Sequence, residues 1–468
     1  MKDRLKEDMD KIKLNPKLKE DTIRLMREAL NKEEKSSLPI KRKFLITVIG
    51  FALAIALILG MPNIRPSAPG NNNSPLINIA TAENLMERIE GEKVKDIDIF
   101  PEDFLNKTTE FSVDMFKTLA GEENAVYSPT PLYLSLGLIL NGANDEAKAE
   151  ILKALSNEGI TEEELNLYYK GLIKEFTRNT GDTVLNINNS IWYDDYFKAN
   201  VKFLEDNKTY YNADAYKIDF SSSVAHNAIN DWVKEVTNGK IQKMVDEVSK
   251  DTVMYLFSSI YFNGKWETPF DKKNTFSGEF YLNNNTTTDV KFMSKNLLVQ
   301  NMYNEGEEEG ILLPYNDGKY ALMALMPDDG IDIRYYVSTL SADKIKEKME
   351  KMGESRVQVY FPKFEINYET KLINSIKALG ITRIFDERGN SLVNMGEGSG
   401  NLFISDMLQK TYIKVDESGT EAASAVGTEI TLTSMPPTIN FNRPFVYFIM
   451  DTSTGLPLFI GIMDNPNL

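Results

Sequence analysis

The sequence predicts an α+β fold with a large sheet for residues 96–468. Three observations support this fold class. Helical and strand patterns are mixed along the region, and the strand-like runs begin or end at turn residues. No internal repeat is present, so a solenoid or a propeller is not expected. Near the C-terminus, the segment "VDESGTEAASAVGTEITLTSMPP" (Val415–Pro437) combines small residues with strand-like alternation.

The N-terminal part of the chain predicts a membrane anchor. Residues 44–61, "FLITVIGFALAIALILGM", form an 18-residue run without a charge, which is long enough to cross a bilayer. Lys41, Arg42 and Lys43 precede the run, so residues 1–43 should be cytoplasmic and the rest of the chain extracytoplasmic. A cleaved signal peptide is the rival interpretation, but its polar lead would be unusually long.

Charge and composition divide the chain at this run. Residues 1–43 carry 14 Lys and Arg and 9 Asp and Glu, a net charge of +5 that suits an anionic inner membrane face, whereas the remainder carries −21. Residues 62–95 are interpreted as a linker, because "IRPSAPGNNNSPL" crowds Pro, Gly, Asn and Ser together. The folded domain is expected at 96–468.

Within that domain, two segments have helical spacing and five resemble strands. The helical segments are "EFSVDMFKTLA" and "AINDWVKEVTNGKI". The strand-like segments are "LNINNSIWY", "VMYLFSSIYFNGKW", "KYALMALMPDD", "VQVYFPKFEI" and "KTYIKVDE".

Composition excludes several kinds of function. The net charge of −16 makes a nucleic-acid partner improbable, since phosphate recognition needs a basic surface. No cysteine is present, so disulfides, thiolate metal sites and cysteine nucleophiles are excluded. The single histidine, His226, falls in a helical pattern, where we expect a surface or half-buried position. We therefore predict neither an enzyme nor a metal site, and no Gly-rich phosphate loop appears.

The alternation in the C-terminal segment separates two faces. An uncharged face would hold Thr420, Ala422, Ser424, Val426, Thr428 and Ile430, whereas both glutamates, Glu421 and Glu429, fall on the other. Such a strand could insert into a sheet over a packed layer, and it must stop before Pro436. Composition alone favours a polar surface loop instead.

Seven segments of the chain resemble signatures of the serpins, the serine protease inhibitor family. "VDESGTEAASA" (Val415–Ala425) resembles the hinge of the reactive-centre loop in inhibitory members. All seven segments occur in the order typical of the family, over about 340 residues. The other six are Asn124–Ala143, Ala228–Ile241, Ile260–Phe270, Leu313–Asp329, Val359–Asp386 and Phe441–Pro466.

This resemblance implies a serpin fold of three β-sheets and about nine helices with an exposed reactive-centre loop. It also implies an irreversible, cofactor-independent inhibitor, here a membrane-anchored bacterial one that acts as a monomer. The target protease cleaves the loop, and the loop then inserts as a central strand and traps the enzyme. The hinge residues are Glu417, Gly419, Thr420, Glu421, Ala422, Ala423, Ser424 and Ala425.

Family spacing counted from Gly419 places the reactive bond at Thr433-Ser434, with Leu432-Thr433 left open. A small uncharged Thr433 suits a subtilisin-like or elastase-like serine protease rather than a trypsin-like one. Leu432 would instead suit a cysteine protease that selects by the residue before the cleaved position.

Two departures from the family pattern bear on regulation. Serpins commonly hold the sheet-opening region with a hydrogen-bonded cluster of Ser, Asn and His. Ser128 is retained here, but Pro131, Ser258 and Gln409 stand where the family has that Ser, Asn and His, respectively. A bond between Gln409 and Ser258 could substitute, or the region could be tuned to a different stability. The near-neutral "NDEAKAEILKALS" makes heparin binding unexpected. A non-inhibitory serpin-fold surface or structural protein is the alternative function.

Overall fold

The computed structural model describes residues 82–121, 123–178, 183–249, 252–284, 286–301, 308–316, 318–398, 401–420 and 436–468. The expected membrane segment, residues 44–61, and the cytoplasmic segment, residues 1–43, lie outside these ranges. Among the described residues, no helix combines the length and the apolar character that a membrane span requires. All described residues belong to one unit, residues 75–468.

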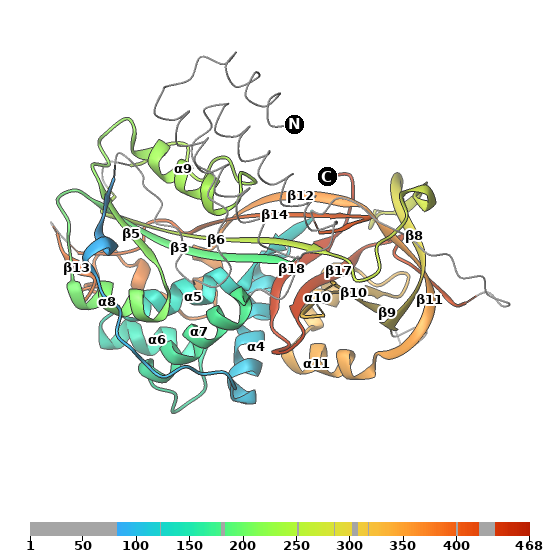
Figure 1. The fold of residues 1–468 in the computed structure, drawn as a ribbon, viewed down its shortest axis with the longest axis horizontal. Coiled ribbons are helices and arrows are strands. Elements are labelled where there is room, and N and C mark those ends of the chain that lie inside the picture. The colour runs from blue at the N-terminus through green and yellow to red at the C-terminus, as the bar shows by residue number, and fades with distance from the viewer. Residues whose placement is uncertain are drawn as a thin grey trace, which may run out of the picture. The chain divides into compact units, whose positions relative to one another are not determined.

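A seven-stranded sheet runs through the domain (Figure 1). Its strands, in spatial order, are β1 (Glu83–Asn84), β5 (Asp214–Ile218), β3 (Val184–Asp194), β6 (Met254–Lys265), β15 (Gly419–Thr420), β14 (Leu408–Asp416) and β12 (Phe364–Lys371). The first edge strand lies outside the expected domain boundary at residue 96, so the packed region begins at Glu83 rather than at Asp96.

A nine-stranded sheet and a two-stranded sheet complete the β-structure described. The larger one orders β16 (Thr438–Asn440), β11 (Gly353–Pro362), β8 (Thr287–Asn301), β9 (Glu308–Pro314), β10 (Tyr320–Pro327), β17 (Phe445–Asp451), β18 (Pro457–Met463) and β2 (Ala125–Tyr127), and β7 (Phe276–Tyr281) pairs with β8. The smaller one joins β13 (Gly396–Glu397) to β4 (Lys198–Ala199).

The described residues form nine α-helices and three short 3₁₀ turns. The α-helices are α4 (Glu102–Leu119), α5 (Pro129–Leu140), α6 (Asp145–Leu155), α7 (Glu162–Thr177), α8 (Val201–Tyr210), α9 (Ala225–Val236), α10 (Ile333–Thr339), α11 (Ala342–Lys351) and α12 (Ile373–Ala378). The 3₁₀ turns are η1 (Leu85–Arg88), η2 (Lys272–Asn274) and η3 (Arg383–Phe385). The prediction of about nine helices and three sheets is thus confirmed for the part of the chain that the structure describes.

Sequence patterns account for the position of these elements. Helix α5 is apolar on every side and is buried along its whole length, which is what a helix inside a domain requires. Strands β17 and β18 are equally buried and contain almost unbroken apolar runs. Helix α7 begins at a capping box, in which Thr161 and Glu164 bond each other's backbone amides.

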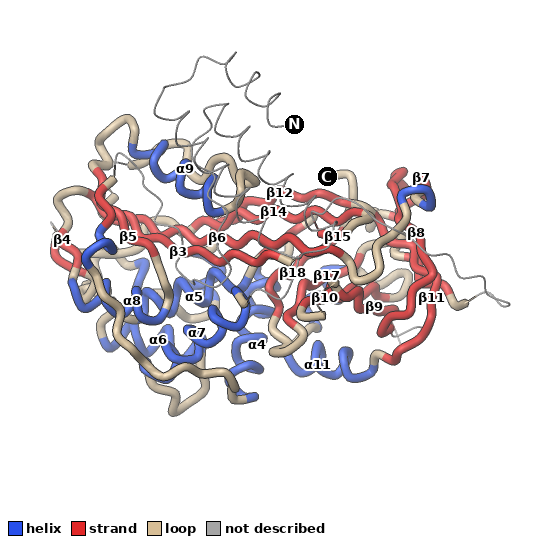
Figure 2. Tube along the Cα trace, viewed as in Figure 1, coloured by secondary structure: helices blue, strands red, loops and turns tan. Residues whose placement is uncertain are grey.

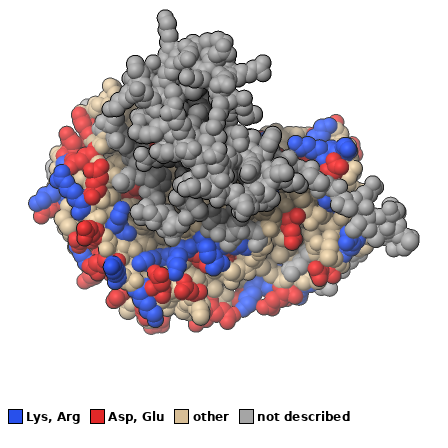
Figure 3. All heavy atoms as spheres, in the orientation of Figure 1, with Lys and Arg blue, Asp and Glu red and all other residues tan. Residues whose placement is uncertain are grey.

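The helices cover both faces of the seven-stranded sheet. Helices α5, α6, α7 and α8 lie on one side and α9 lies on the other (Figure 2). Trp192 and Phe257 pack with Trp232 of α9 in a separate apolar cluster, whereas Ile260 and Phe262 face the main core. On the face shown in Figure 3, acidic and basic side chains are interspersed.

Candidate functional site

The predicted hinge enters the seven-stranded sheet at Gly419. Strand β15 pairs antiparallel with β14, through Val415 and Thr420, and antiparallel with β6, through Thr420 and Gly264. Because β15 is antiparallel to both neighbours, β6 and β14 run parallel to each other with β15 between them. The chain that follows Thr420 therefore leaves from a position inside the sheet rather than from its edge.

Thr420 faces the main core of the domain. Its side chain is 2 % exposed, and its Oγ1 lies 2.6 Å from the Tyr315 Oη. Tyr315 is itself fully buried and stacks on Trp266, with the ring centroids 4.7 Å apart. Thr420 is the first residue of the uncharged face described above, so that face begins on the core side of the sheet.

Gly419 occupies a position that no other residue could take without strain. Its φ is +146°, and a Cβ built there would lie 2.1 Å from the carbonyl oxygen of Gly264. The Trp266 amide also donates to Ser418 O at 3.0 Å, and the Trp266 Nε1 donates to Asp416 O at 2.9 Å. The turn before β15 is thus held by Trp266, the residue after β6, through one backbone and one side-chain hydrogen bond.

Glu417 holds the same turn through its side chain. Its buried carboxylate accepts hydrogen bonds from the Lys363 Nζ at 3.0 Å and from the Thr275 Oγ1 at 2.7 Å. Burial acts to raise the pKa of Glu417, but the bonds from Lys363 and Thr275 outweigh burial and hold that pKa below its ordinary value. The carboxylate is therefore charged and paired at neutral pH.

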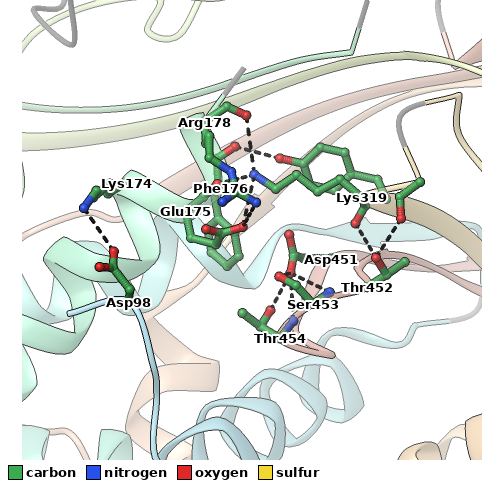
Figure 4. Close-up of polar contacts among 12 residues, drawn as sticks. Asp98, Lys174, Glu175, Phe176, Arg178, Lys319, Asp451, Thr452, Ser453 and Thr454 are labelled. Carbon is green, nitrogen blue, oxygen red and sulfur yellow. Dashed lines mark hydrogen bonds and ion pairs between the residues drawn. The ribbon is translucent and has the colours of Figure 1, made fainter. Parts of the chain in front are cut away.

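The turn that carries Tyr315 is held by the C-terminal end of α7. The Tyr315 amide donates to Tyr320 O at 2.9 Å, and the Tyr320 Oη donates to Phe176 O at 2.6 Å. The buried Lys319 Nζ donates to the carbonyl oxygens of Glu175 and Arg178 (Figure 4). The sequence does not predict this role of Lys319, because no helical or strand pattern marks a lysine as the cap of a distant helix.

The sheet-opening residues form two separate clusters. On the β14 side, the Gln409 Oε1 accepts from the Ser128 amide and its Nε2 donates to Ser128 O, both at 2.8 Å. On the β6 side, the Ser258 Oγ donates to the Asn189 Oδ1 at 2.8 Å and contacts the hydroxyl of Ser135.

This arrangement corrects the expected bond between Gln409 and Ser258. The Gln409 amide uses both of its polar atoms on the backbone of Ser128, which lies just before α5. Pro131 lies in the first turn of α5, and the hydroxyl that reaches Ser258 comes from Ser135, one helical turn further on. The i, i+4 spacing of Pro131 and Ser135 was the signal that could have identified the replacement.

The remaining predicted site residues lie outside the described residues. They are Glu421, Ala422, Ala423, Ser424, Ala425, Leu432, Thr433 and Ser434, so their roles stay predictions. His226 lies in the first turn of α9 and is half-buried, as expected. Among the described residues, no cluster of His, Cys, Asp or Glu could hold a metal ion.

Comparison with known proteins gives a consistent result. The family profile described as "Serpin (serine protease inhibitor)" matches residues 106–466. Alpha-1-antiproteinase F of Cavia porcellus is 32 % identical over 76 % of this chain and 89 % of its own length. The native-state structure of the thermophilic serpin tengpin is 34 % identical, with a TM-score of 0.77 over 82 % of this chain and 100 % of that one. Its latent-state structure scores 0.70 over 79 % of this chain and 100 % of that one, at 31 % identity.

Proposed function

Because the chain belongs to the serpin family, we propose that it is an irreversible inhibitor of an extracytoplasmic protease. Serpins are mostly protease inhibitors and are generally not catalysts. The observation that carries the proposal is the pairing of Gly419 and Thr420 with strands on both sides, because it gives the loop an entry point inside the sheet.

Continuing the β15 register along the chain gives a specific insertion path. Ala422 would lie between Phe262 and Ile413, and Ser424 would lie between Ile260 and Thr411. These neighbours face the main core or are buried, so small uncharged side chains on the loop can be covered without the large desolvation penalty that a charge would carry.

The opposite face of the inserted strand would suit Glu421. The same register places Glu421 beside Lys414, which pairs with Glu365 at 3.1 Å on the half-exposed face of β14. A carboxylate is therefore brought next to a cation rather than into the core. The positions of Glu421, Ala422 and Ser424 thus agree with the two sides of the sheet.

The proposed reaction is a trapped cleavage. The nucleophile of the target protease attacks the carbonyl carbon of Thr433 and forms an acyl-enzyme, while the Thr433–Ser434 peptide bond breaks and the amino group of Ser434 leaves with a proton. The loop then inserts and displaces the bound protease. A subtilisin-like or elastase-like serine protease fits Thr433, and a cysteine protease that selects Leu432 is the second class to test. We further propose that residues 44–61 anchor the chain with its N-terminus in the cytoplasm, and that it acts as a monomer without heparin.

The test mixes the protein with a subtilisin-like or an elastase-like protease. An SDS-stable complex with a new N-terminus at Ser434 is the expected result, identified by mass spectrometry. Cleavage of the loop should also raise the melting temperature, because the completed sheet is the more stable form. If the loop is cleaved but no complex forms and the melting temperature does not change, a non-inhibitory surface protein is favoured instead.

A further inference from the structure

Residues 83–100 form a strap along the outside of the domain. Strand β1 extends the seven-stranded sheet by pairing Asn84 with Tyr216, and Met86 is 3 % exposed in the main core. Further along, the Glu92 amide donates to the Thr209 Oγ1 of α8 at 2.8 Å. Asp96 and Asp98 then pair with Lys174 of α7, at 2.9 and 3.0 Å. The strap therefore fixes the place where the preceding chain meets the domain.

That place lies at the end of the sheet opposite the hinge. The sheet registers connect Asn84 to Tyr216, Tyr216 to Trp192, and Trp192 to Tyr255 of β6. The hinge instead meets β6 at Gly264. Nine positions of β6 separate the two rows, which corresponds to about 30 Å at the usual rise of a strand. In Figure 2, β5 ends on the left of the sheet and β15 lies towards its right.

Insertion of the loop would carry its cleaved end to the strap. In the β15 register, Ile430 would lie beside Met254, the first residue of β6 and the neighbour of Tyr255. Thr433 follows three residues later. A protease held as an acyl-enzyme on Thr433 would therefore arrive at the end of the domain where the N-terminal chain enters.

We infer that the strap attaches the membrane tether at the end of the domain that receives the trapped protease, and that residues 62–81 are a spacer that leaves room for it. This inference rests on the proposed function, both on trapping and on the anchor.

The length of the spacer matches this task. A protease of about 250 residues is about 45 Å across. Residues 62–81 number 20, so this stretch can reach about 70 Å when fully extended and spans about 25 Å as a relaxed coil. Ten residues can reach only about 35 Å, which is less than the protease needs. Removing half of the spacer should therefore interfere with trapping at a membrane.

The experiment uses the full chain, once in vesicles of phosphatidylethanolamine and phosphatidylglycerol and once in detergent. One variant lacks Pro66–Pro75, and the matched control replaces these ten residues with Gly and Ser. Subtilisin is added outside, and the amount of SDS-stable complex is divided by the total amount of cleaved chain. We expect the deletion to lower this ratio at least fivefold in vesicles only, and the control to leave it unchanged.

A second variant tests the strap itself. Met86→Asp should release the strap from the core and lengthen the tether, so it should restore trapping to the deletion variant in vesicles, whereas Met86→Leu should not. The inference would be overturned if the deletion variant trapped as well as the unmodified chain in vesicles, or if its ratio fell as much in detergent as in vesicles. It would also be overturned if Met86→Asp did not restore trapping to the deletion variant. Absence of any complex between the unmodified chain in detergent and each of the proteases named above, subtilisin-like, elastase-like and cysteine, would overturn the proposed function as well.

Discussion

The hydroxyl groups of Thr420 and Tyr315 lie 2.6 Å apart inside the domain, between the end of β6 and the core. Tyr315 stacks on Trp266, and the backbone of Trp266 bonds the turn that precedes Thr420. The first residue of the uncharged face is thus already placed between two strands, with its side chain on the side of the sheet that a fully inserted loop would bury. Changes at this position should separate cleavage of the loop from trapping of the protease.

Thr420→Arg should convert the inhibitor into a substrate. In the intact protein β15 consists only of Gly419 and Thr420, so an arginine can leave the sheet and keep its guanidinium in solvent. A fully inserted loop would instead hold the unpaired guanidinium where Thr420 is 2 % exposed. A penalty of about 3 kcal/mol against insertion is a conservative value for an uncompensated buried charge. Such a penalty lowers the ratio of trapped to cleaved protein more than a hundredfold. Gel quantification of complex and cleaved chain measures this ratio.

Thr420→Ser is the matched control for that substitution. It keeps the hydroxyl that contacts Tyr315 and removes only a methyl group, so the fraction of trapped protease should stay close to that of the unmodified chain. If Thr420→Arg trapped as well as Thr420→Ser, the assignment of the uncharged face to the core would be wrong.

Glu417 should make the attachment of the hinge sensitive to acid. The pKa of its buried carboxyl is held below the ordinary value by Lys363 and Thr275. A group with a depressed pKa in the folded state stabilises the fold above its unfolded pKa, and this contribution is lost as the pH falls through the folded pKa. Stability measured by denaturant titration should therefore fall below about pH 4.3, and Glu417→Gln should flatten this dependence.

Glu369→Gln provides the comparison on the same sheet. Glu369 pairs with Lys410 across two strands at 2.9 Å, but its side chain is 54 % exposed. Exposed pairs contribute about 0 to 1 kcal/mol, so this substitution should leave the acid branch of the stability curve nearly unchanged. An equal effect of both substitutions would mean that the burial of Glu417 is not what matters.

Much of the fold could be predicted because its patterns are local. The unbroken apolar runs of β17 and β18, and the alternation in β14, follow directly from what each strand buries. The Pro, Gly, Asn and Ser residues of 64–76 predict a linker over residues 62–95, but residues 83–95 belong to the packed domain. A single buried side chain, Met86, and backbone pairing hold them there. Pairing through the backbone leaves little trace in a sequence.

The sheet-opening region shows a second limit. The identity of Gln409 indicates that an amide replaces a family histidine, but an amide can bond any donor or acceptor within reach. Its partner, the backbone of Ser128, is 281 positions away in the chain, and backbone atoms are the same at every position. The choice between Ser128 and Ser258 was therefore a question of tertiary geometry that spacing could not decide.

Lys319→Met should loosen the hinge from a distance. Lys319 donates to carbonyl groups at the C-terminal end of α7, and its neighbour Tyr320 holds the amide of Tyr315. Removing the ammonium leaves those carbonyls without this donor, which should lower the free energy of unfolding by about 1 to 3 kcal/mol. Hydrogen exchange of the peptide that contains Gly419 and Thr420 should accelerate. Lys344→Met, on the exposed face of α11, is the control and should change neither quantity.

Gln409 and Ser258 should contribute independently to stability, because they belong to separate clusters. Gln409→Ala removes the partner of the Ser128 backbone, and Ser258→Ala removes the donor to Asn189. Each substitution should lower the free energy of unfolding by about 1 to 3 kcal/mol, and the double variant should show the sum within about 0.5 kcal/mol. A coupling energy above 1 kcal/mol, of the size expected for a direct bond, would contradict the separation.

The same single and double substitutions can be measured in the loop-cleaved protein, where the inserted strand would meet both clusters. The β15 register would place Val426 between Ser258 and Gln409, so the inserted strand would pass between the two clusters. Neither cluster has to give up these hydrogen-bond partners, Ser128 on one side and Asn189 and Ser135 on the other, to admit that strand. Gln409→Ala should therefore destabilise the intact and the cleaved protein equally. A loss confined to the intact form would show instead that Gln409 holds the sheet closed and releases its bonds on insertion.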